Sequence, residues 1–399
     1  MKVIFKASVL FAAVIGLAAC NGNNSTSMPG TAGQAPFAQS KLQRESLGAK
    51  ATAACQGSRV GMAQCDALVR SGAGPNFSGL TPANLRSAYK LTATLLATHG
   101  AGQIVAVVDA CDNPNVASDL ATFRAYFPGM PATTLHKYNQ TGQQSNYPTC
   151  SSGWGVEIDL DVEMVSVSCP NCTIYLVEAN SNGWSDLQTA EAEAVTLGAT
   201  IISNSFGGTG ANQAFFSTAH KTYLASAGDS GYGIADPADF DTVVSVGGTT
   251  LTAGPPPRHW TETIWSGSGA GCSTDAKPIW QTDPGCANRT ANDVSAFANP
   301  SPGVAEYDTY GGFSGWIAVG GTSVGTPLLA GIFGLKGNST VQKGGRTFWN
   351  PAHQVHLYPI LAGNDGACGG SYLCTAGTGQ HGSYSGPGGW GSPKGMNAF

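Results

Sequence analysis

The sequence predicts an α/β protein with a doubly wound, mainly parallel sheet and flanking helices, and three observations lead to that prediction. Short apolar runs with the length and flanks of buried strands recur at residues 103–108, 173–177, 200–204, 222–227, 243–246 and 316–320. Segments with apolar residues at three- and four-residue spacing lie at 119–127, 154–168 and 186–197, as crossover helices would. Glycine-rich stretches at 254–257, 267–271 and 363–399 are predicted loops or irregular structure.

The composition bounds the class of protein. With 399 residues, 42% of them hydrophobic, the chain can build a sizeable core in one large or two medium domains. Only 11% of the residues are charged, and 19 Lys and Arg stand against 24 Asp and Glu. A nucleic-acid partner is therefore excluded, because it would need a basic surface. After the first twenty residues, no apolar stretch is long enough to span a bilayer.

The N-terminus predicts export. Residues 1–19 combine a short basic start with an apolar run, which is the pattern of a signal peptide. The run ends in Leu-Ala-Ala-Cys, which resembles the lipobox of bacterial lipoproteins and makes Cys20 the predicted lipidation site. An ordinary small-residue cleavage site is the alternative. We expect residues 20–79 to be a tether and short extension, 80–399 to be a single catalytic domain, and the chain to be membrane-anchored, facing the periplasm or the cell surface.

The cysteines agree with an oxidising compartment. Eleven cysteines less a lipidated Cys20 leave ten, which can form five disulfides. Near-neighbour pairing predicts the bridges 55–65, 111–150, 169–172, 272–286 and 368–374. A redox or zinc half-site at 169–172 is the alternative for that pair, but no second ligand pair stands at metal-ligand spacing.

Ser323 is the candidate nucleophile. It lies in Gly-Gly-Thr-Ser-Val-Gly-Thr-Pro, where an apolar run passes through a glycine turn into a predicted helix. Unpaired N–H groups at a helix N-terminus can stabilise an oxyanion. The alternative is a serine that only caps the helix. The motif Gly-Thr-Ser-x-x-x-Pro is, however, the serine motif of the subtilisin-like and sedolisin peptidases.

A serine nucleophile needs a base, and a histidine does not supply it here. A subtilisin-like enzyme would carry an aspartate, then a His-Gly-Thr-His block, then the serine. Asp109 imitates the first of these, but the histidine block is absent, since His99-Gly100 precedes Asp109 and His381-Gly382 follows Ser323. We interpret Asp109 as a turn aspartate at the end of a strand.

Carboxyl groups are the candidate base. In the predicted helix 154–168, Glu157 and Asp161 are four residues apart and share one face, so repulsion and burial would raise at least one pKa. A solvated acidic face is the alternative, and Asp159 and Glu163 are interpreted as solvated. Asp229, in Ser-Ala-Gly-Asp-Ser-Gly, follows an apolar strand, where an Asx-turn is the alternative role.

Three separated motifs in this order resemble the sedolisin family of serine-carboxyl peptidases: Glu-x-x-x-Asp, Ser-Ala-Gly-Asp-Ser-Gly and Gly-Thr-Ser-x-x-x-Pro. The resemblance extends from about residue 80 to the C-terminus and implies a subtilisin-like fold. It further implies that Ser323 is the nucleophile, Glu157 the general base and acid, Asp161 its partner and Asp229 the oxyanion donor. Both carboxyl roles favour acidic pH.

The same resemblance assigns a peptide-binding edge to residues 202–208. There, Ser203, Ser205 and Gly207 would pair with the backbone of an extended polypeptide substrate. Two departures from the family stand out. Only about sixty residues separate Cys20 from residue 80, so no long propeptide fits. The family also has a calcium site, and this chain lacks both of its carboxylates, at Pro359 and Ser385. We therefore expect no calcium cofactor and a tail secured by the bridge 368–374.

Three function classes follow from the sequence. The leading hypothesis is an exported, lipid-anchored acid peptidase that acts through an acyl-enzyme on Ser323. An endopeptidase is expected, and a tripeptidyl-peptidase is the alternative that the sequence leaves open. A catalytically silent peptide-binding lipoprotein on a peptidase scaffold is the second. A glycosidase that uses Glu157 and Asp161 is the third, and it is disfavoured because such carboxylates flank a sugar from separate elements.

Overall fold

A computed structural model describes residues 51–55, 60–70, 79–131, 133–150, 153–337, 344–378 and 382–399. All of them belong to one compact unit that spans residues 34–399. The predicted signal peptide, the lipidation site Cys20 and the predicted tether lie outside the described residues. Among the described residues, no helix has both the length and the apolar character to cross a membrane.

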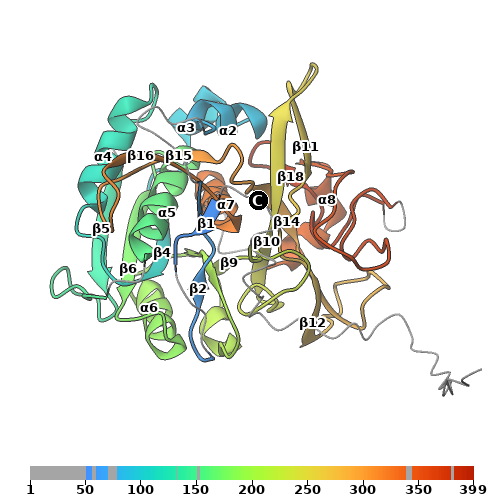
Figure 1. Ribbon diagram of the computed structural model, residues 1–399, viewed down its shortest axis with the longest axis horizontal. Helices are drawn as coiled ribbons and strands as arrows, with labels where there is room; N and C mark the ends of the chain where they lie inside the picture. The colour runs from blue at the N-terminus through green and yellow to red at the C-terminus, as the bar shows by residue number, and fades with distance from the viewer. Residues whose placement is uncertain are drawn as a thin grey trace, which may run out of the picture. The chain divides into compact units, whose positions relative to one another are not determined.

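A central sheet of eight described strands confirms the predicted α/β class (Figure 1). Its pairings are parallel except for the antiparallel edge formed by β10 and β11. The strand order is β11 (Trp260–Ile264), β10 (Val243–Ala253), β9 (Thr222–Ser226), β7 (Ile201–Asn204), β4 (Ile104–Ala110), β6 (Thr173–Ala179) and β5 (Thr134–Asn139), with β14 (Val294–Phe297) also paired to β10.

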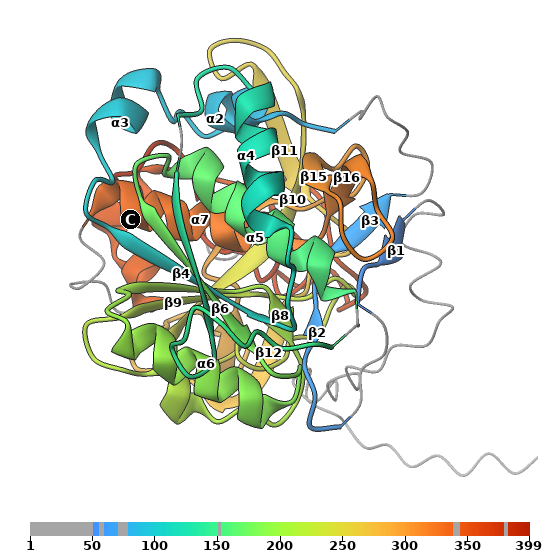
Figure 2. The same cartoon turned by 90° about the vertical axis from the view of Figure 1, so that its left-hand side faces the viewer.

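Helices cover both faces of this sheet (Figure 2). The described helices are α2 (Pro82–Ala88), α3 (Ala93–Thr98), α4 (Val116–Tyr126), α5 (Trp154–Ser168), α6 (Trp184–Thr196), α7 (Thr322–Lys336) and α8 (Pro351–Gln354), with short 3-10 turns η1 (Gln213–Phe216) and η3 (Arg346–Trp349). In Figure 2, α4 and α5 lie on one side of the strands and α6 on the other. Side chains of a strand alternate between faces, and β4 shows the consequence. Its Val105 and Val107 join the core of α5 and α7, while Ala106 and Val108 join the core of α6.

Helices α5 and α7 pack against each other and carry the predicted site. The predicted helix 154–168 is present with those bounds, and every residue in it is buried. Helix α7 begins after Gly321, whose φ of 104° lies in the region that glycine tolerates best. Pro327 lies inside the helix, beyond its first turn, so α7 lacks one backbone N–H donor at this position.

The last predicted strand exists but belongs to a second sheet. This sheet is antiparallel and has the order β1 (Ala51–Ala53), β3 (Leu68–Arg70), β16 (Gly315–Gly320) and β15 (Val304–Asp308). Residues 316–320 are therefore the predicted strand, and β16 pairs antiparallel with β15 and β3 rather than with the parallel sheet. Three small antiparallel pairs complete the described strands: β2 (Gln64–Cys65) with β8 (Phe206–Gly207), β12 (Gly271–Ala276) with β13 (Asn288–Ala291), and β17 (Leu357–Tyr358) with β18 (Ser392–Pro393).

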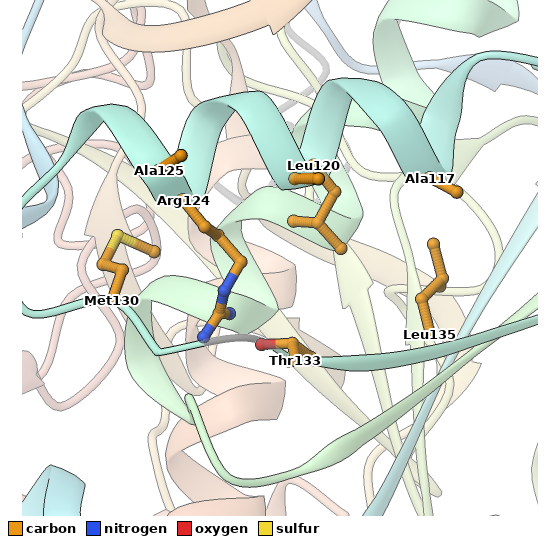
Figure 3. A pocket seen from close by; sticks show the side chains of 8 residues that line it. Ala117, Leu120, Arg124, Ala125, Met130, Thr133 and Leu135 are labelled. Carbon is orange, nitrogen blue, oxygen red and sulfur yellow. The ribbon is translucent and has the colours of Figure 1, made fainter.

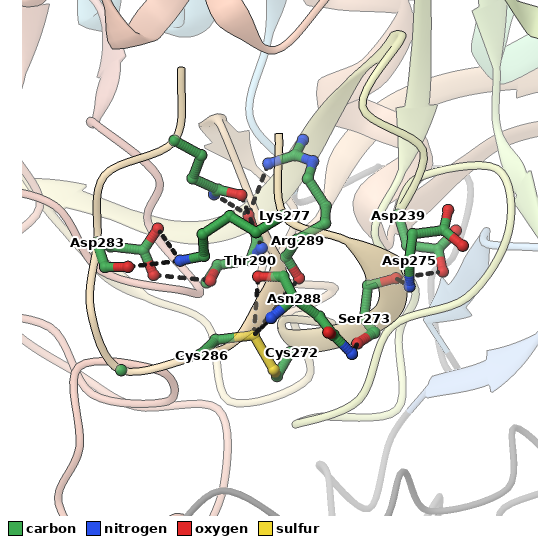
Figure 4. Close-up of a disulfide and its surroundings, with 12 residues drawn as sticks. Asp239, Cys272, Ser273, Asp275, Lys277, Asp283, Cys286, Asn288, Arg289 and Thr290 are labelled. Carbon is green, nitrogen blue, oxygen red and sulfur yellow. Dashed lines mark hydrogen bonds and ion pairs between the residues drawn. A yellow bond between two sulfur atoms is a disulfide. The ribbon is translucent and has the colours of Figure 1, made fainter. Parts of the chain in front are cut away.

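All five predicted disulfides are present, at 55–65, 111–150, 169–172, 272–286 and 368–374. The redox or zinc alternative for the pair 169–172 is therefore not favoured. Figure 4 shows how one bridge is supported by its surroundings. Beside Cys272 and Cys286, the Lys277 ammonium lies 2.9 Å from Asp283, whose carboxylate also accepts a hydrogen bond from Thr290 at 2.7 Å. Side-chain polar bonds and the bridge thus hold a long loop without regular secondary structure.

Candidate active site

The four predicted catalytic residues come from three elements that meet at one place. Glu157 and Asp161 lie one turn apart on α5, Asp229 follows the carboxyl end of β9, and Ser323 is the second residue of α7. Glu157, Asp161 and Ser323 are fully buried. Two further residues make the hydrogen bonds that connect them. Ser205 bonds to Asp161 and Ser323, and Thr322 bonds to Asp229.

Ser323 has the surroundings of a nucleophile at a helix N-terminus. Its hydroxyl donates a hydrogen bond to the Ser205 carbonyl oxygen at 3.3 Å. Its backbone N–H points to another carbonyl oxygen, that of Asp66, at 3.4 Å. A main-chain N–H in the first turn of a helix has no intrahelical partner, so it is available to a carbonyl or an oxyanion.

Glu157 and Asp161 form a buried, coupled acid pair. Burial raises the pKa of Glu157 well above its usual value, and the charges of Asp161 and Asp109 raise it further. The Ser323 hydroxyl acts on the same carboxyl and lowers its pKa, so the two side chains lie within interaction range. Neither oxygen of Glu157 makes a hydrogen bond of ordinary geometry to a described residue. Glu157 therefore has an acceptor atom available for a proton.

Asp161 is held in place by Ser205. The Ser205 hydroxyl donates to Asp161 Oδ1 at 2.7 Å. Burial raises the pKa of Asp161 well above its usual value, while the hydrogen bond from Ser205 and the neighbouring Glu157 carboxyl group oppose the rise. The two carboxyls thus share protons as one titrating unit, as the sequence predicts. Ser205 connects both ends of the site, since its carbonyl accepts from Ser323 and its hydroxyl supports Asp161.

Asp109 belongs to the same acid network, so its interpretation as a turn aspartate is wrong. It lies within β4 and is fully buried, and neither carboxyl oxygen has a hydrogen-bond partner among the described residues. Burial, followed by the charges of Asp161 and Glu178, raises its pKa well above the usual value. The sequence singles out Asp109 because it follows an apolar run. Its acidic neighbours are seen only once α5 packs over β4.

Asp159 and Glu163 are also buried, so the prediction that they are solvated is wrong. Asp159 accepts a hydrogen bond from the Asn113 amide at 2.7 Å, and Glu163 accepts from the Tyr307 N–H at 3.2 Å. Asn113, which follows β4, and Tyr307 of β15 cover this side of α5. A helical wheel shows only which residues share a face, and not whether another element covers that face. Oxygen atoms of Asp119, Asp159 and Asp308 lie within 4.8 Å of one another. Burial and the neighbouring carboxylates raise the pKa of Asp159 well above its usual value.

Asp229 is fixed to the start of α7. Its Oδ1 accepts hydrogen bonds from the N–H and the hydroxyl of Thr322, at 2.7 and 2.9 Å. The other oxygen, Oδ2, lies beside Gly321, where an added Cβ would stand only 2.4 Å away. One oxygen thus anchors the side chain, and the second lies against Gly321, just before the start of α7.

The three predicted substrate-binding residues have different positions. Gly207 lies in β8, whose backbone pairs with β2, and Ser205 immediately precedes β8. Ser203 lies inside β7, which already pairs with β4 and β9 on both sides. The edge at residues 205–207 is therefore already paired with residues 64–66, and Ser203 lies behind it.

A cavity elsewhere in the fold contains none of these groups. Figure 3 shows it between α4 and β5, with a volume of about 380 Å³ and a lining that includes Leu120, Arg124, Met130 and Leu135. Its walls are mostly apolar side chains. The buried acid network and Ser323 do not contribute to it.

The predicted loss of the calcium site stays a prediction. The Ser385 hydroxyl accepts from the Gly388 N–H at 3.2 Å, so this position takes part in an internal turn. Asp365 is buried, neither of its carboxyl oxygens has a hydrogen-bond partner among the described residues, and burial raises its pKa well above the usual value. The bridge between Cys368 and Cys374 that was expected to secure this tail is present.

Comparison with known proteins identifies the family. Residues 98–339, more than half of the chain, match the model of the subtilase family. The chain belongs to the subtilase family. This subtilase is 26% identical to sedolisin of Pseudomonas sp. (strain 101) in an alignment of 306 residues that covers 63% of the chain and 50% of the relative. It therefore spans about half the length of that curated relative.

Solved structures agree with the fold. A structure of Pseudomonas sedolisin, a serine-carboxyl proteinase complexed with two molecules of pseudo-iodotyrostatin, has 25% identity and a TM-score of 0.64, covering 80% of this subtilase and 96% of that chain. Fervidolysin from Fervidobacterium pennivorans, a keratinolytic enzyme related to subtilisin, shares the fold at 13% identity, with a TM-score of 0.51 over 79% of this subtilase and 45% of that chain. The subtilisin-like α/β fold is thus confirmed.

Proposed function

We propose that this subtilase is a serine-carboxyl peptidase of the sedolisin type that hydrolyses peptide bonds at acidic pH, as an endopeptidase, through an acyl-enzyme on Ser323. One observation carries the proposal. The Ser323 hydroxyl lies within interaction range of a buried carboxyl that is coupled to a second one, at the N-terminus of a helix. Among the residues that the structure describes, no histidine acts on Glu157 or Asp161. A carboxyl group therefore has to carry the proton.

The proposed mechanism gives a role to each of these groups. Glu157 accepts the Ser323 hydroxyl proton as Oγ attacks the substrate carbonyl, and Asp161, supported by Ser205, takes up the change in charge. The Ser323 N–H and a protonated Asp229 stabilise the oxyanion. Glu157 then donates its proton to the leaving amine. Water, deprotonated by Glu157, hydrolyses the ester and restores the hydroxyl.

The proposed mechanism favours acidic pH because two of its carboxyl groups must carry protons. Asp229 donates to an oxyanion only while its carboxyl group carries a proton, and Glu157 must return a proton to the leaving group. The raised pKa values of Glu157 and Asp161 keep protons on the pair in acid and into less acidic solution. As the pH rises through those values, the pair loses its proton and the activity is expected to fall.

Export and lipid anchoring through Cys20 complete the proposal. Five disulfides support an oxidising compartment, and the lipobox-like sequence supports attachment to a bacterial membrane. Radiolabelled fatty acid should enter the wild-type chain and not a Cys20→Ser variant. Labelling of both chains, or of neither, would contradict the anchor.

An acid digest tests the proposed activity. Wild-type protein at roughly pH 3–5 should cut an unfolded protein internally, and Ser323→Ala and Glu157→Gln should reduce the rate by at least about a thousandfold. Ser118→Ala is a matched control, because Ser118 is also a serine in the first turn of a helix but is exposed on α4. If wild type and Ser323→Ala behaved alike, a silent peptide-binding protein would be the better conclusion.

A further inference from the structure

The cavity between α4 and β5 has the size of a ligand-binding site that the proposed catalytic chemistry does not use (Figure 3). Its volume of about 380 Å³ falls within the range of small-molecule pockets, which is about 300–1,000 Å³. Neither Ser323 nor the buried acid network lines it. A molecule that binds there has to be recognised by the chemistry of the cavity's own walls.

Small residues of α4 leave the space for this cavity. Ala117, Ala121 and Ala125 follow one another at four-residue spacing, so they share one face of the helix, and all three line the cavity. Each of these alanines is exposed, whereas Leu120, which also lines the cavity, is only 3% exposed. The cavity therefore opens to solvent beside the alanines and is closed at Leu120.

The remaining wall is mainly apolar. Met130 is buried, and Leu135 of β5 is half-buried. Apart from Arg124, the only polar side chain in the described lining is that of Thr133, whose hydroxyl donates to the Pro170 carbonyl oxygen at 3.4 Å. A bound peptide would leave most of its amide groups without partners, and burying them unpaired costs free energy. The walls thus favour an apolar chain over a peptide.

Arg124 places a buried positive charge at the cavity. Its side chain extends from α4 toward Thr133 in Figure 3, and the residue is only 4% exposed. None of its three guanidinium nitrogens has a hydrogen-bond partner among the described residues. A guanidinium group carries five N–H donors, and unpaired buried donors are costly. These donors are suited to an acceptor that a bound molecule would bring.

The charge of Arg124 is reinforced by a second arginine. Arg86 donates to the carbonyl oxygens of Val167 at 2.8 Å and Gly129 at 3.1 Å, and its Nη2 has no partner among the described residues. Burial, followed by the charge of Arg86, lowers the pKa of Arg124 to about 10, so Arg124 is cationic at neutral pH. In the part of the chain that the structure describes, no carboxylate forms an ion pair with either arginine. The acceptor is therefore expected to be an anion.

From the apolar walls and the unpaired guanidinium group we infer that the cavity binds a fatty acid of medium chain length, with its carboxylate on Arg124 and its chain between α4 and β5. Two parallel N–H donors of a guanidinium group match the two oxygens of a carboxylate, and such charge-assisted pairs are strong. The alkyl chain would cover Leu120, Met130 and Leu135, and it carries no polar group that needs a partner.

This site is independent of the proposed peptidase activity. It contains no group of the proposed mechanism, so its occupant is a ligand and not a substrate. Since Arg124 and Leu120 belong to α4 and Leu135 to β5, a bound fatty acid would join these two elements and stabilise the folded chain. Failure of one proposal leaves the other untouched.

Titration calorimetry with decanoate tests the inference. The full-length, oxidised chain carries Cys20→Ser as the parent, so that no acyl chain of the predicted anchor competes for the cavity. At pH 7, where the carboxylate is ionised, and below the concentration at which micelles form, about one decanoate should bind per chain. Arg124→Met should weaken the affinity at least about tenfold, because the charged hydrogen bonds are lost. Arg346→Met is the matched control and should bind like the parent, since Arg346 is exposed on η3.

Three comparisons separate the possible outcomes. Ala121→Phe fills the cavity from an exposed helical position and should abolish binding with little change in Tm, so it serves should Arg124→Met fail to fold. Decanol, which has the same chain without the charge, should bind at least about tenfold more weakly than decanoate. An acetylated Ala-Ala-Leu peptide that binds more tightly than decanoate would overturn the fatty-acid assignment. Absence of saturable decanoate binding, or equal affinity in the parent and Arg124→Met, would overturn the site itself.

Discussion

The protein is expected to lose stability as the pH rises from about 4 to about 7, and Asp239 gives the magnitude. Burial, then the charge of Asp236, raises the pKa of Asp239 from 3.8 to about 7, against the opposing hydrogen bond that Ser273 donates at 2.9 Å. A rise of about three units corresponds to about 4 kcal/mol. Because the folded pKa exceeds the unfolded one, this contribution is complete below about pH 4 and is lost as the pH rises through about 7. Against a typical stability of about 5–15 kcal/mol, the loss is large.

The substitution Asp239→Asn isolates this contribution. Asparagine does not titrate and still offers an acceptor to Ser273. Urea unfolding at several pH values between 4 and 7 should show the wild-type free energy of unfolding falling with pH, and falling by up to about 4 kcal/mol less in the variant. Glu193→Gln, on the surface of α6, should follow wild type. If Asp239→Asn and wild type gave parallel curves, the assignment of this pH dependence to Asp239 would be refuted.

Four further outcomes are expected. Ser205→Ala should lower kcat about tenfold with a smaller change in KM, measured on a peptide at acidic pH, because Asp161 loses a donor at 2.7 Å. Gly321→Ala should lower kcat/KM about a hundredfold or more, because the new Cβ would stand 2.4 Å from Asp229 Oδ2, beside the place where the oxyanion is proposed to bind. In Asp229→Asn, whose amide donates at every pH, the activity should fall less steeply with rising pH than in wild type. Removal of calcium by a chelator should leave Tm unchanged, whereas a drop of several degrees would show a bound ion that the substitutions at Pro359 and Ser385 argue against.

The sequence predicts the parts of the fold that depend on local pattern. Helix α5 has the predicted bounds, and β4, β6, β7 and β9 were predicted to within a few residues, because apolar runs and helical spacing are local signals. Strands β5 and β14 were not predicted, and β10 is longer than predicted. The pairing of β16 was not predictable in this way. An apolar run shows that a strand is buried, but not which sheet buries it.

The same distinction between local and long-range information applies to the site residues. Ser323, Glu157, Asp161 and Asp229 each stand in a short motif, and the structure brings them to one place. The burial of Asp159 and the neighbours of Asp109 depend on segments far apart in the sequence, so no local pattern could show them. Asp66 carries no motif at all. Its only sequence signal is the adjacent Cys65, whose bridge to Cys55 indicates an ordered segment.

The central claim is that a carboxyl group activates Ser323, and trapping the acyl-enzyme tests it most directly. Wild-type protein mixed with a peptide substrate is quenched in denaturing acid within one turnover, and the fragment that contains Ser323 is weighed by mass spectrometry. At about pH 4 the fragment should carry the acyl group, and Glu157→Gln should carry none; at about pH 8 the wild-type adduct should form far more slowly. Acylation of Ser323 that is as fast at pH 8 as at pH 4, or that persists in Glu157→Gln, would contradict the account.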